Sequence, residues 1–344
     1  MGGGLRGSGR WRASAEALIA GAGLGAALWG SVAGLASRPG PASAAEAATE
    51  PAAYRWSLPE GITPPPVPPD NPMSEAKVAL GRRLFSDPRL SFNRTTSCAT
   101  CHDPARELTD GRARAIGASG EPHARNTPTL WNVAYNVSYT WIDQGLVRLE
   151  DQLRLPLTGT EPVEMGFGPA AAAALAADPE LAALHRAAFG EAPFDETSVV
   201  RALASYVRTL IRMDSAFDRR LYLDDASGFG EAAERGMGLF FSERLGCGHC
   251  HAGPHLSGPT AMPGREVAPV FHRTAVSDAT VAFRAPSLRF VARTAPYMHD
   301  GSLATLADVV AFYERGGGRG AERLVPFTLS PSERAALLAF LETL

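Results

Sequence analysis

The sequence predicts a mainly α-helical protein of two domains with long irregular loops. Three observations support this fold class. Several segments carry apolar residues at the spacing of a helix, and no run alternates with a period of two for long enough to make a sheet. All four cysteines of the 344-residue chain lie in two matching pentapeptides, CATCH at Cys98–His102 and CGHCH at Cys247–His251.

The N-terminus has the layout of an export signal. Three arginines among the first twelve residues precede a mostly apolar run from about Ala17 to Ala36, and residues 42–44 (Ala-Ser-Ala) fit a cleavage site. The run is also long enough to span a bilayer, which takes about 20 residues, so an uncleaved anchor is the alternative. We interpret residues 1–44 as a cleaved signal peptide and predict a periplasmic protein whose mature form has no membrane span.

The charge balance argues against nucleic acid as a partner. Residues 1–44 contain four of the 33 basic residues and one of the 36 acidic residues. The mature chain therefore has 29 basic and 35 acidic residues and a net charge of −6. No basic patch is evident, so we expect no nucleic-acid binding. The 300 residues after position 44 allow two domains of ordinary size.

The expected elements follow in chain order. Residues 45–70 are rich in proline and alanine, which favours an extended lead-in with polyproline character. The first helix is expected to begin near Ser74, because SEAKVALGRRLF places Val78, Leu84 and Phe85 among charged residues.

Two later segments have stronger helix signals. Residues 197–212 carry five apolar residues on one helical face: Val199, Leu203, Tyr206, Val207 and Leu210. In the tail, Ser330 is the expected N-cap, Pro331 takes the first helical position, and Glu333 completes a capping box.

The cysteine pattern allows three chemistries: a zinc site, a dithiol–disulfide couple, or covalent attachment of haem c. Zinc sites built from two Cys-x-x-Cys pairs usually have them close in sequence, whereas 145 residues separate Cys101 from Cys247. A redox couple normally occurs once, near a β-α-β pattern, and none is visible.

In an exported chain, Cys-x-x-Cys-His is typical of c-type haem attachment. Two thiols one helical turn apart reach the two vinyl groups, and the adjacent histidine places an imidazole on the iron. We therefore predict two covalent haem c groups. Their thioethers would form at Cys98, Cys101, Cys247 and Cys250, and their proximal iron ligands would be His102 and His251.

The motifs around the pentapeptides resemble the bacterial di-haem cytochrome c peroxidase/MauG superfamily from about Asn71 to Leu344. The matching phrases are KVALGRRLFSDPRLS, SCATCH, RNTPTLWN, PVEMG and FRAPSLRFVARTAPYMHDGSLATL. LPEGITPPPVPPDNPMSEAKVALG and RLEDQ are most similar to the MbnH group of MauG-like enzymes. The resemblance implies two cytochrome c-like haem domains, a peroxidatic one over 71–215 and a second over 216–344, with the final helix, 330–344, able to pack on the first.

The resemblance also implies roles for residues near the first haem. Glu164 in PVEMG matches the distal glutamate, Gln152 in RLEDQ the pocket glutamine, and Pro156 a pocket-shaping proline. A carboxylate in a restricted pocket can carry a proton between the two oxygens of peroxide. Trp141 aligns with a tryptophan that relays electrons between the haems, and Trp131 is the reserve candidate. The alternatives are an ordinary surface glutamate and a core tryptophan.

Two positions distinguish branches of the superfamily. Conventional di-haem peroxidases have a methionine ligand where this chain has Tyr313, and MauG-like proteins have tyrosine there. A thioether favours ferrous iron, and a phenolate favours ferric and higher states. We predict Tyr313 as distal ligand of the second haem, the alternative being Met298 or Met262. His123 lies only two residues before Arg125, so we interpret the histidine that blocks the first iron in many relatives as absent.

The family also holds a calcium ion between its domains. The matching ligands are the side chain of Asn126 and the backbone carbonyls of Thr294 and Pro296, which are hard oxygen donors. Turn formation before Thr127-Pro128 is the alternative role for Asn126.

The resemblance implies an enzyme that uses hydrogen peroxide to generate high-valent haem. By similarity to the MauG and MbnH groups, it would then oxidise a residue of a periplasmic partner protein, most often a tryptophan, by long-range electron transfer. The main alternative is a conventional cytochrome c peroxidase that takes electrons from a small cytochrome c or cupredoxin. A third possibility is a di-haem electron carrier without catalytic activity, which Glu164 argues against.

Overall fold

The structure is a computed structural model that describes residues 54–59 and 61–344. The predicted signal peptide, residues 45–53 of the lead-in and residue 60 lie outside the described residues. The α-helices of the described chain are α1 (Glu75–Phe85), α2 (Cys98–Cys101), α3 (Leu149–Thr158), α4 (Pro169–Ala176), α5 (Pro179–Phe189), α6 (Glu196–Arg208), α7 (Ala216–Tyr222), α8 (Glu231–Phe240), α9 (Cys247–Cys250), α10 (Leu306–Glu314) and α11 (Pro331–Leu341).

The remaining regular structure of the described chain is short. Four 3-10 helices are η1 (Pro88–Leu90), η2 (Pro104–Arg106), η3 (Val133–Tyr135) and η4 (Val291–Arg293). Two strands, β1 (Phe271–His272) and β2 (Phe283–Arg284), pair antiparallel, with Phe271 opposite Arg284. The prediction of a mainly helical fold with long irregular loops is confirmed. No helix in the described ranges is long and apolar enough to cross a membrane.

The predicted helix starts are confirmed by their caps. The Ser74 side chain accepts a hydrogen bond from the Lys77 amide at the start of α1. Ser330 and Glu333 form the expected capping box of α11, with Pro331 at the first helical position. α6 ends four residues before the predicted boundary at position 212. Asn132 holds the chain in a non-helical path there. Its backbone amide donates to Leu210 O, its Nδ2 donates to Arg212 O, and its Oδ1 accepts from the Arg212 amide.

In the N-terminal half, α1 packs across α6 at a glycine. A Cβ atom on Gly81 would collide with the Ala202 carbonyl and with Tyr206, so the two helices approach closely only because position 81 lacks a side chain. The buried residues around this crossing form a hydrophobic cluster that runs from Leu80 to Leu210. Cys98 packs against this cluster, so the crossing positions the first pentapeptide.

The C-terminal half repeats this arrangement with α8 and α11. A Cβ atom on Gly236 would collide with the Ala336 carbonyl and with Phe340, which is fully buried. The second hydrophobic cluster runs from Phe217 to Leu344, and Cys247 packs against it. α11 is therefore part of the second cluster, and we propose that it belongs to the second haem domain rather than packing on the first. The apolar face of α11 packs on α8, the helix that precedes the second pentapeptide.

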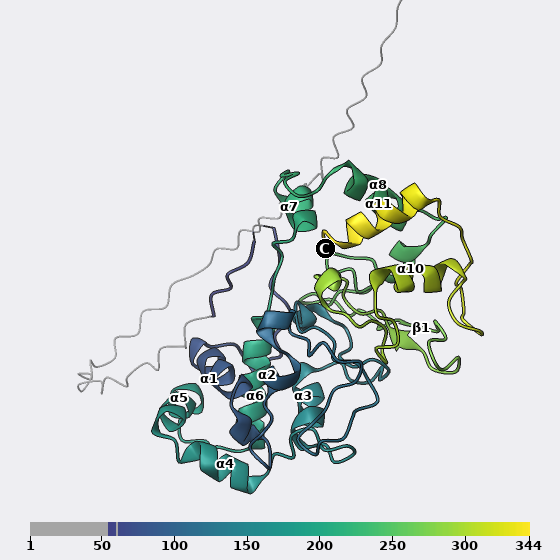
Figure 1. Ribbon diagram of the computed structural model, residues 1–344. Coiled ribbons are helices and arrows are strands. Elements are labelled where there is room, and N and C mark those ends of the chain that lie inside the picture. The colour runs from purple at the N-terminus through teal and green to yellow at the C-terminus, as the bar shows by residue number, and fades with distance from the viewer. Residues whose placement is uncertain (1–53, 60) are drawn as a thin grey trace, which may run out of the picture. The chain divides into compact units, whose positions relative to one another are not determined.

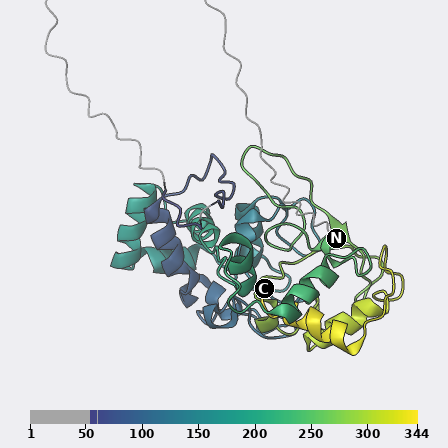
Figure 2. The same cartoon turned by 90° about the horizontal axis from the view of Figure 1, so that it is seen from above.

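The helices form two groups. Figure 1 shows α1, α3, α4, α5 and α6 together and α7, α8, α10 and α11 together, and the view in Figure 2 keeps the purple-to-teal helices apart from the yellow ones. Along the chain, the first hydrophobic cluster ends at Leu210 and the second begins at Phe217. We propose that these clusters are the cores of two haem domains, with the boundary near residue 215.

A buried ionic network joins Asn71 and α1 to α3 and α6. Arg208 donates to Glu150 Oε2 at 2.8 Å, and Asn71 Nδ2 donates to Glu150 Oε1 at 2.8 Å. Lys77 Nζ donates to Asn71 Oδ1 at 3.1 Å. Burial, the largest single influence, opposes ionisation of Glu150, but the hydrogen bond and charge of Arg208 and the hydrogen bond from Asn71 together hold the pKa of Glu150 below its usual range.

We expect Glu150→Ala to lower the free energy of unfolding by about 3–5 kcal/mol, because it leaves Arg208 buried without a counter-charge. The matched control is Glu322→Ala, which breaks an exposed pair with Arg273 and should cost less than about 1 kcal/mol. Urea unfolding of the two holoprotein variants measures the difference. Equal, small losses in both variants would contradict a structural role for the network.

Candidate functional site

Each pentapeptide forms one turn of helix with its histidine directly after the turn. His102 donates its backbone amide to Cys98 O at 2.8 Å after α2, and His251 donates to Cys247 O at 2.9 Å after α9. The Ser97 amide donates to Thr100 Oγ1 at 2.9 Å and caps α2. The two thiols of each pair therefore lie one turn apart, followed by an imidazole, as the sequence predicts.

The two imidazoles are oriented in the same way. His102 Nδ1 lies 3.0 Å from Leu108 O, and His251 Nδ1 lies 2.9 Å from Leu256 O. Both acceptor residues adopt positive φ, 60° at Leu108 and 51° at Leu256. We assign a proton to each Nδ1, which leaves Nε2 as the nitrogen that can bind iron. Burial lowers the pKa of both rings, to about 4 for His251, so the rings are neutral, as an iron ligand must be.

The environment of the four thiols fits thioether formation. Burial raises the pKa of Cys98 to about 12 and those of Cys101 and Cys247 to about 11, and it also raises that of Cys250. Thiolate ligands and reactive dithiols have lowered pKa values. Within the described part of the chain, no three His, Cys, Asp or Glu side chains gather to hold a bare metal ion. The two cysteine pairs therefore do not come together as one zinc site.

Arg284 gives a second test of the fit to haem. Its side chain is buried, and among the described residues its guanidinium donates only to backbone carbonyls, Thr140 O at 3.3 Å and Ala285 O at 3.1 Å. Burial lowers the pKa of Arg284 to about 10, and its charge acts on His251. A buried arginine normally pairs with a carboxylate, and haem carries two propionate carboxylates. The second site therefore fits haem, because Arg284 would find a carboxylate partner in a propionate of the bound group.

Glu164 lies beside the first cysteine pair. Its charge acts on both Cys98 and Cys101, and Cys101 Sγ lies 4.0 Å from the carbonyl of Ile116 in the adjoining loop. The Glu164 side chain keeps 42% of its surface accessible, yet desolvation by the surrounding chain raises its pKa to about 7. A carboxyl group with a pKa near neutrality can both accept and return a proton.

α3 lies next to Glu164. The amide of Met165, the residue after Glu164, donates to Pro156 O at 3.1 Å, so the structure brings Glu164 and Pro156 together. Gln152 precedes Pro156 by one turn of α3 and lies on the same face. We propose that Gln152 and Pro156 line the pocket of the first haem with Glu164.

Trp141 bridges two segments that reach the two proximal histidines. Its Nε1 donates to Asn126 O at 3.1 Å, and its carbonyl accepts from the Arg284 amide at 2.9 Å. The backbone of Pro128, which follows Asn126 by two residues, lies at the His102 ring. The backbone of Pro286, which follows Arg284 by two residues, lies at the His251 ring. We propose Trp141 as the relay between the two haems.

Trp131, the reserve candidate, has a different environment. Its Nε1 donates to Glu107 Oε2 at 2.9 Å, and the Arg212 guanidinium lies 5.5 Å from its ring centroid. A cation over the ring opposes removal of an electron from it. We therefore retain Trp141.

Tyr313 lies near the C-terminal end of α10, close to the second cysteine pair. Desolvation raises its pKa, and the charges of Cys250 and Cys247 add to that rise. Met262, one of the alternative ligands, is 38% exposed. We propose Tyr313 as the distal ligand of the second haem, because its hydroxyl shares the enclosed environment of the two thiols.

The backbone of Asn126 meets the segment that follows Thr294 and Pro296. The Asn126 amide donates to His299 O at 2.7 Å, and Asn126 Nδ2 donates to Arg112 O at 2.7 Å. Among the described residues, no hydrogen bond uses Asn126 Oδ1 or the carbonyls of Thr294 and Pro296, and none joins these residues to one another. We propose these three oxygens as calcium ligands.

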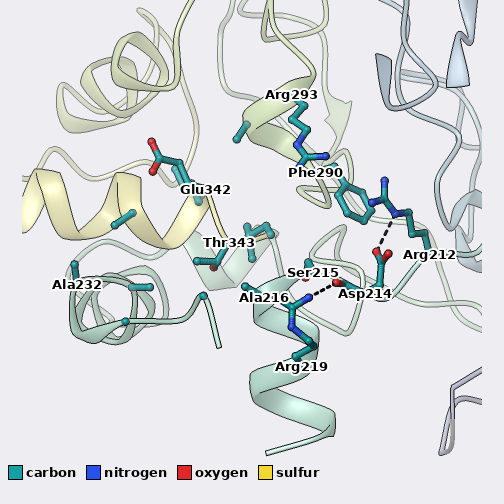
Figure 3. Close-up of a pocket in the computed structure, with 17 residues that line it drawn as sticks. Arg212, Asp214, Ser215, Ala216, Arg219, Ala232, Phe290, Arg293, Glu342 and Thr343 are labelled. Carbon is teal, nitrogen blue, oxygen red and sulfur yellow. Dashed lines mark hydrogen bonds and ion pairs between the residues drawn. The ribbon is translucent and has the colours of Figure 1, made fainter. Parts of the chain in front are cut away.

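A cavity of about 530 Å³ between α7, η4 and the end of α11 is not this site. Figure 3 shows its three arginines, and all are paired: Arg212 with Asp214 at 2.8 Å, Arg219 with Asp225 at 3.7 Å, and Arg293 with Glu107 at 2.9 Å. None of the cysteines, proximal histidines, Glu164 or Tyr313 lines it.

The sequence analysis missed two residues of the site. His123 meets Glu164, with Nδ1 3.4 Å from Oε1, and nothing in its sequence context indicates that contact. The sequence did contain a signal for Arg284. In RNTPTL a proline follows Asn126 by two residues, and in FRAPSL a proline follows Arg284 by two residues, so the two segments match at these positions.

Comparison with known proteins places the chain in a family. A family model described as di-haem cytochrome c peroxidase matches residues 75–226. The methylamine utilization protein MauG of Methylorubrum extorquens is 38% identical over 300 residues, which cover 84% of this chain and 83% of that protein. Cytochrome c551 peroxidase of Pseudomonas aeruginosa is 32% identical over 288 residues, covering 79% of this chain and 80% of that one.

A solved structure is similar over most of the chain. The crystal structure of a MauG-like protein associated with microbial copper homeostasis has a TM-score of 0.79 and 36% identity, and the match covers 85% of this chain and 95% of that one. The two Cys-x-x-Cys-His turns are consistent with the two haem c groups of such proteins. The chain belongs to the di-haem cytochrome c peroxidase/MauG family and is a di-haem peroxidase-type oxidoreductase.

Proposed function

We propose that this enzyme is exported to the periplasm and uses hydrogen peroxide to oxidise a residue, a tryptophan, of a partner protein by long-range electron transfer. The observation that carries the proposal is Tyr313 beside Cys247 and Cys250, where conventional relatives have methionine. The identity to MauG and to the MauG-like copper-homeostasis protein supports the same branch.

The two haems, when bound, react with peroxide and store the oxidising equivalents. Glu164 takes the proton of the inner peroxide oxygen and returns it to the outer oxygen, so that water leaves as the O–O bond breaks. Peroxide with two electrons and two protons gives two molecules of water, so each peroxide removes two electrons from the partner. Gln152 and Pro156 would line the same pocket, because Pro156 O accepts a hydrogen bond from the amide next to Glu164 and Gln152 lies one turn away on α3.

Trp141 connects the two sites in this proposal. Its hydrogen bonds to Asn126 O and from the Arg284 amide link it to the backbone beside each proximal histidine. With both haems bound, Trp141 would provide the connection along which electrons from the partner could cross between the two sites. A phenolate at Tyr313 would favour the oxidised forms of a bound second iron, which suits oxidation of a partner better than storage of electrons.

The test uses the diferric holoprotein, produced in a host that attaches haem c. We expect one equivalent of hydrogen peroxide, added without any reductant, to change the visible and near-infrared spectra for minutes. No reaction until one haem has been reduced would contradict the proposal. That outcome would favour peroxide reduction with electrons from a small cytochrome c or cupredoxin, the activity that the name of the Pseudomonas relative indicates.

A further inference from the structure

His123 is a buried histidine that contacts Glu164 from outside the expected site. Its Nδ1 lies 3.4 Å from Glu164 Oε1, and its side chain is 12% exposed. Its Nε2 is buried and has no hydrogen-bond partner among the described residues. A buried ring nitrogen without a partner is uncommon in folded proteins, and this one belongs to a ring that faces the proposed proton carrier.

The backbone holds both residues in place. The His123 amide donates to Ala115 O at 2.8 Å, and the Ala115 amide donates to Arg125 O at 3.2 Å, so His123 lies on one arm of a closed loop. The Ala118 amide, on the other arm, donates to Glu164 O at 2.7 Å. The loop therefore carries His123 and fixes the backbone of Glu164 at the same time.

Gly117 makes the contact possible. A Cβ atom at this position would lie 2.6 Å from Val163 O, 2.7 Å from Glu164 Cα and 3.0 Å from His123 Nε2. Only glycine leaves room for the imidazole and the Glu164 backbone to approach from two sides.

Nδ1 lies within ion-pair distance of the carboxylate, and the tautomer of the ring decides what each nitrogen can do. Donation from Nδ1 to the carboxylate requires the proton on Nδ1, which leaves Nε2 as the unprotonated nitrogen. Nε2 is covered by the chain at Gly117, whereas an iron ligand must face the haem. In this arrangement His123 faces Glu164 with Nδ1 and the chain at Gly117 with Nε2.

We propose that His123 is a positioning residue that holds the Glu164 carboxylate and stabilises its ionised form by donating the Nδ1 proton. The proposal deepens the proposed function and rests on it only for the role of Glu164 as proton carrier. A hydrogen bond to the ionised form favours that form. Removing the donor should therefore make Glu164 hold its proton to a higher pH.

Few other charged groups face the pair. Cys98 and Cys101 are the other titratable groups coupled to Glu164, and both become neutral thioethers in the holoprotein. Asp110 and Arg112 flank Cys101 and carry opposite charges. Desolvation lowers the pKa of His123, so the ring is neutral near pH 7 and can act as a hydrogen-bond donor without adding charge.

Fluoride binding to the diferric holoprotein tests the proposal without peroxide or partner. An anion beside Glu164 binds more tightly when the carboxyl is protonated, because the carboxyl then donates a hydrogen bond and carries no charge. The fluoride affinity, read from the haem spectrum, should therefore fall as pH rises through the titration of the pair. Glu164→Gln should remove this dependence.

Three variants of His123 distinguish the effect of its N–H donor from the effect of the ring itself. His123→Leu and His123→Phe remove the donor and should move the midpoint of the fluoride profile upward by about one pH unit. His123→Asn keeps an N–H near the position of Nδ1 and should stay close to the wild-type midpoint. If one apolar variant does not bind both haems, the other provides the comparison.

An unchanged midpoint in the apolar variants would overturn the proposal, and so would an equal shift in all three. These outcomes are independent of partner oxidation. Failure of the peroxide experiment with a normal fluoride shift would reject the proposed function alone, and the reverse result would reject only the role of His123.

Discussion

Glu164→Gln should slow the reaction of the holoprotein with hydrogen peroxide by about 10²–10⁴-fold, the usual contribution of a general acid–base group. Glutamine keeps the shape and the hydrogen-bonding capacity of the side chain but cannot accept or return a proton. Stopped-flow absorbance of the first haem measures the rate. The matched control is Glu161→Gln, an exposed acid three residues earlier, which should react like the wild type.

The pH dependence of the same rate follows from the raised pKa of Glu164. The carboxylate must be ionised to take the first proton from peroxide, and desolvation raises its pKa to about 7. The wild-type rate should therefore increase as pH rises through about 7, and the Glu164→Gln rate should not show this step. A glutamine variant that keeps both the rate and the step would reject Glu164 as the proton carrier.

Tyr313→Met should raise the reduction potential of the second haem by an amount on the order of tenths of a volt, because axial ligands tune haem potentials over about 0.8 V. The phenolate is anionic and favours ferric iron, whereas the thioether is neutral and favours ferrous iron. A spectroelectrochemical titration measures the shift. The peroxide-induced spectral change should also become short-lived, because the second site no longer favours the oxidised forms.

Tyr222→Met is the matched control for this change, since Tyr222 lies on α7 and is 41% exposed. It should leave both potentials and the lifetime of the spectral change as in the wild type. An unchanged second potential in Tyr313→Met would show that Tyr313 does not bind the iron.

The sequence predicted the local features of the site well. The Cys-x-x-Cys-His turns, the N-cap of α1 at Ser74 and the capping box of α11 all depend on residues within four positions of one another. The apolar face of α6 was predicted for the same reason, because the helical period repeats within the segment. Its C-terminal end was not, since Asn132 ends the helix from 80 residues away in the sequence.

The contacts between segments that are distant in the sequence could be identified only from the structure. α11 has an apolar face that could cover either half of the chain, and the close approach at Gly236 selects α8. The sequence also does not reveal that Arg284 is buried without a carboxylate, or that Trp141 hydrogen bonds to both Asn126 and the Arg284 backbone.

By itself, the sequence therefore determined the chemistry that depends on spacing along the chain: two haem c attachment turns, their histidines, the helix caps and the family. Only the tertiary structure decided the environment of each group: His123 against Glu164, Arg284 beside His251, and the desolvation that brings the pKa of Glu164 to about 7. The physical reason is that burial and electrostatic coupling arise from segments that fold together. Glu164 and His123 are 41 residues apart in the sequence, and backbone hydrogen bonds of the loop 115–125, which carries His123, bring them into contact.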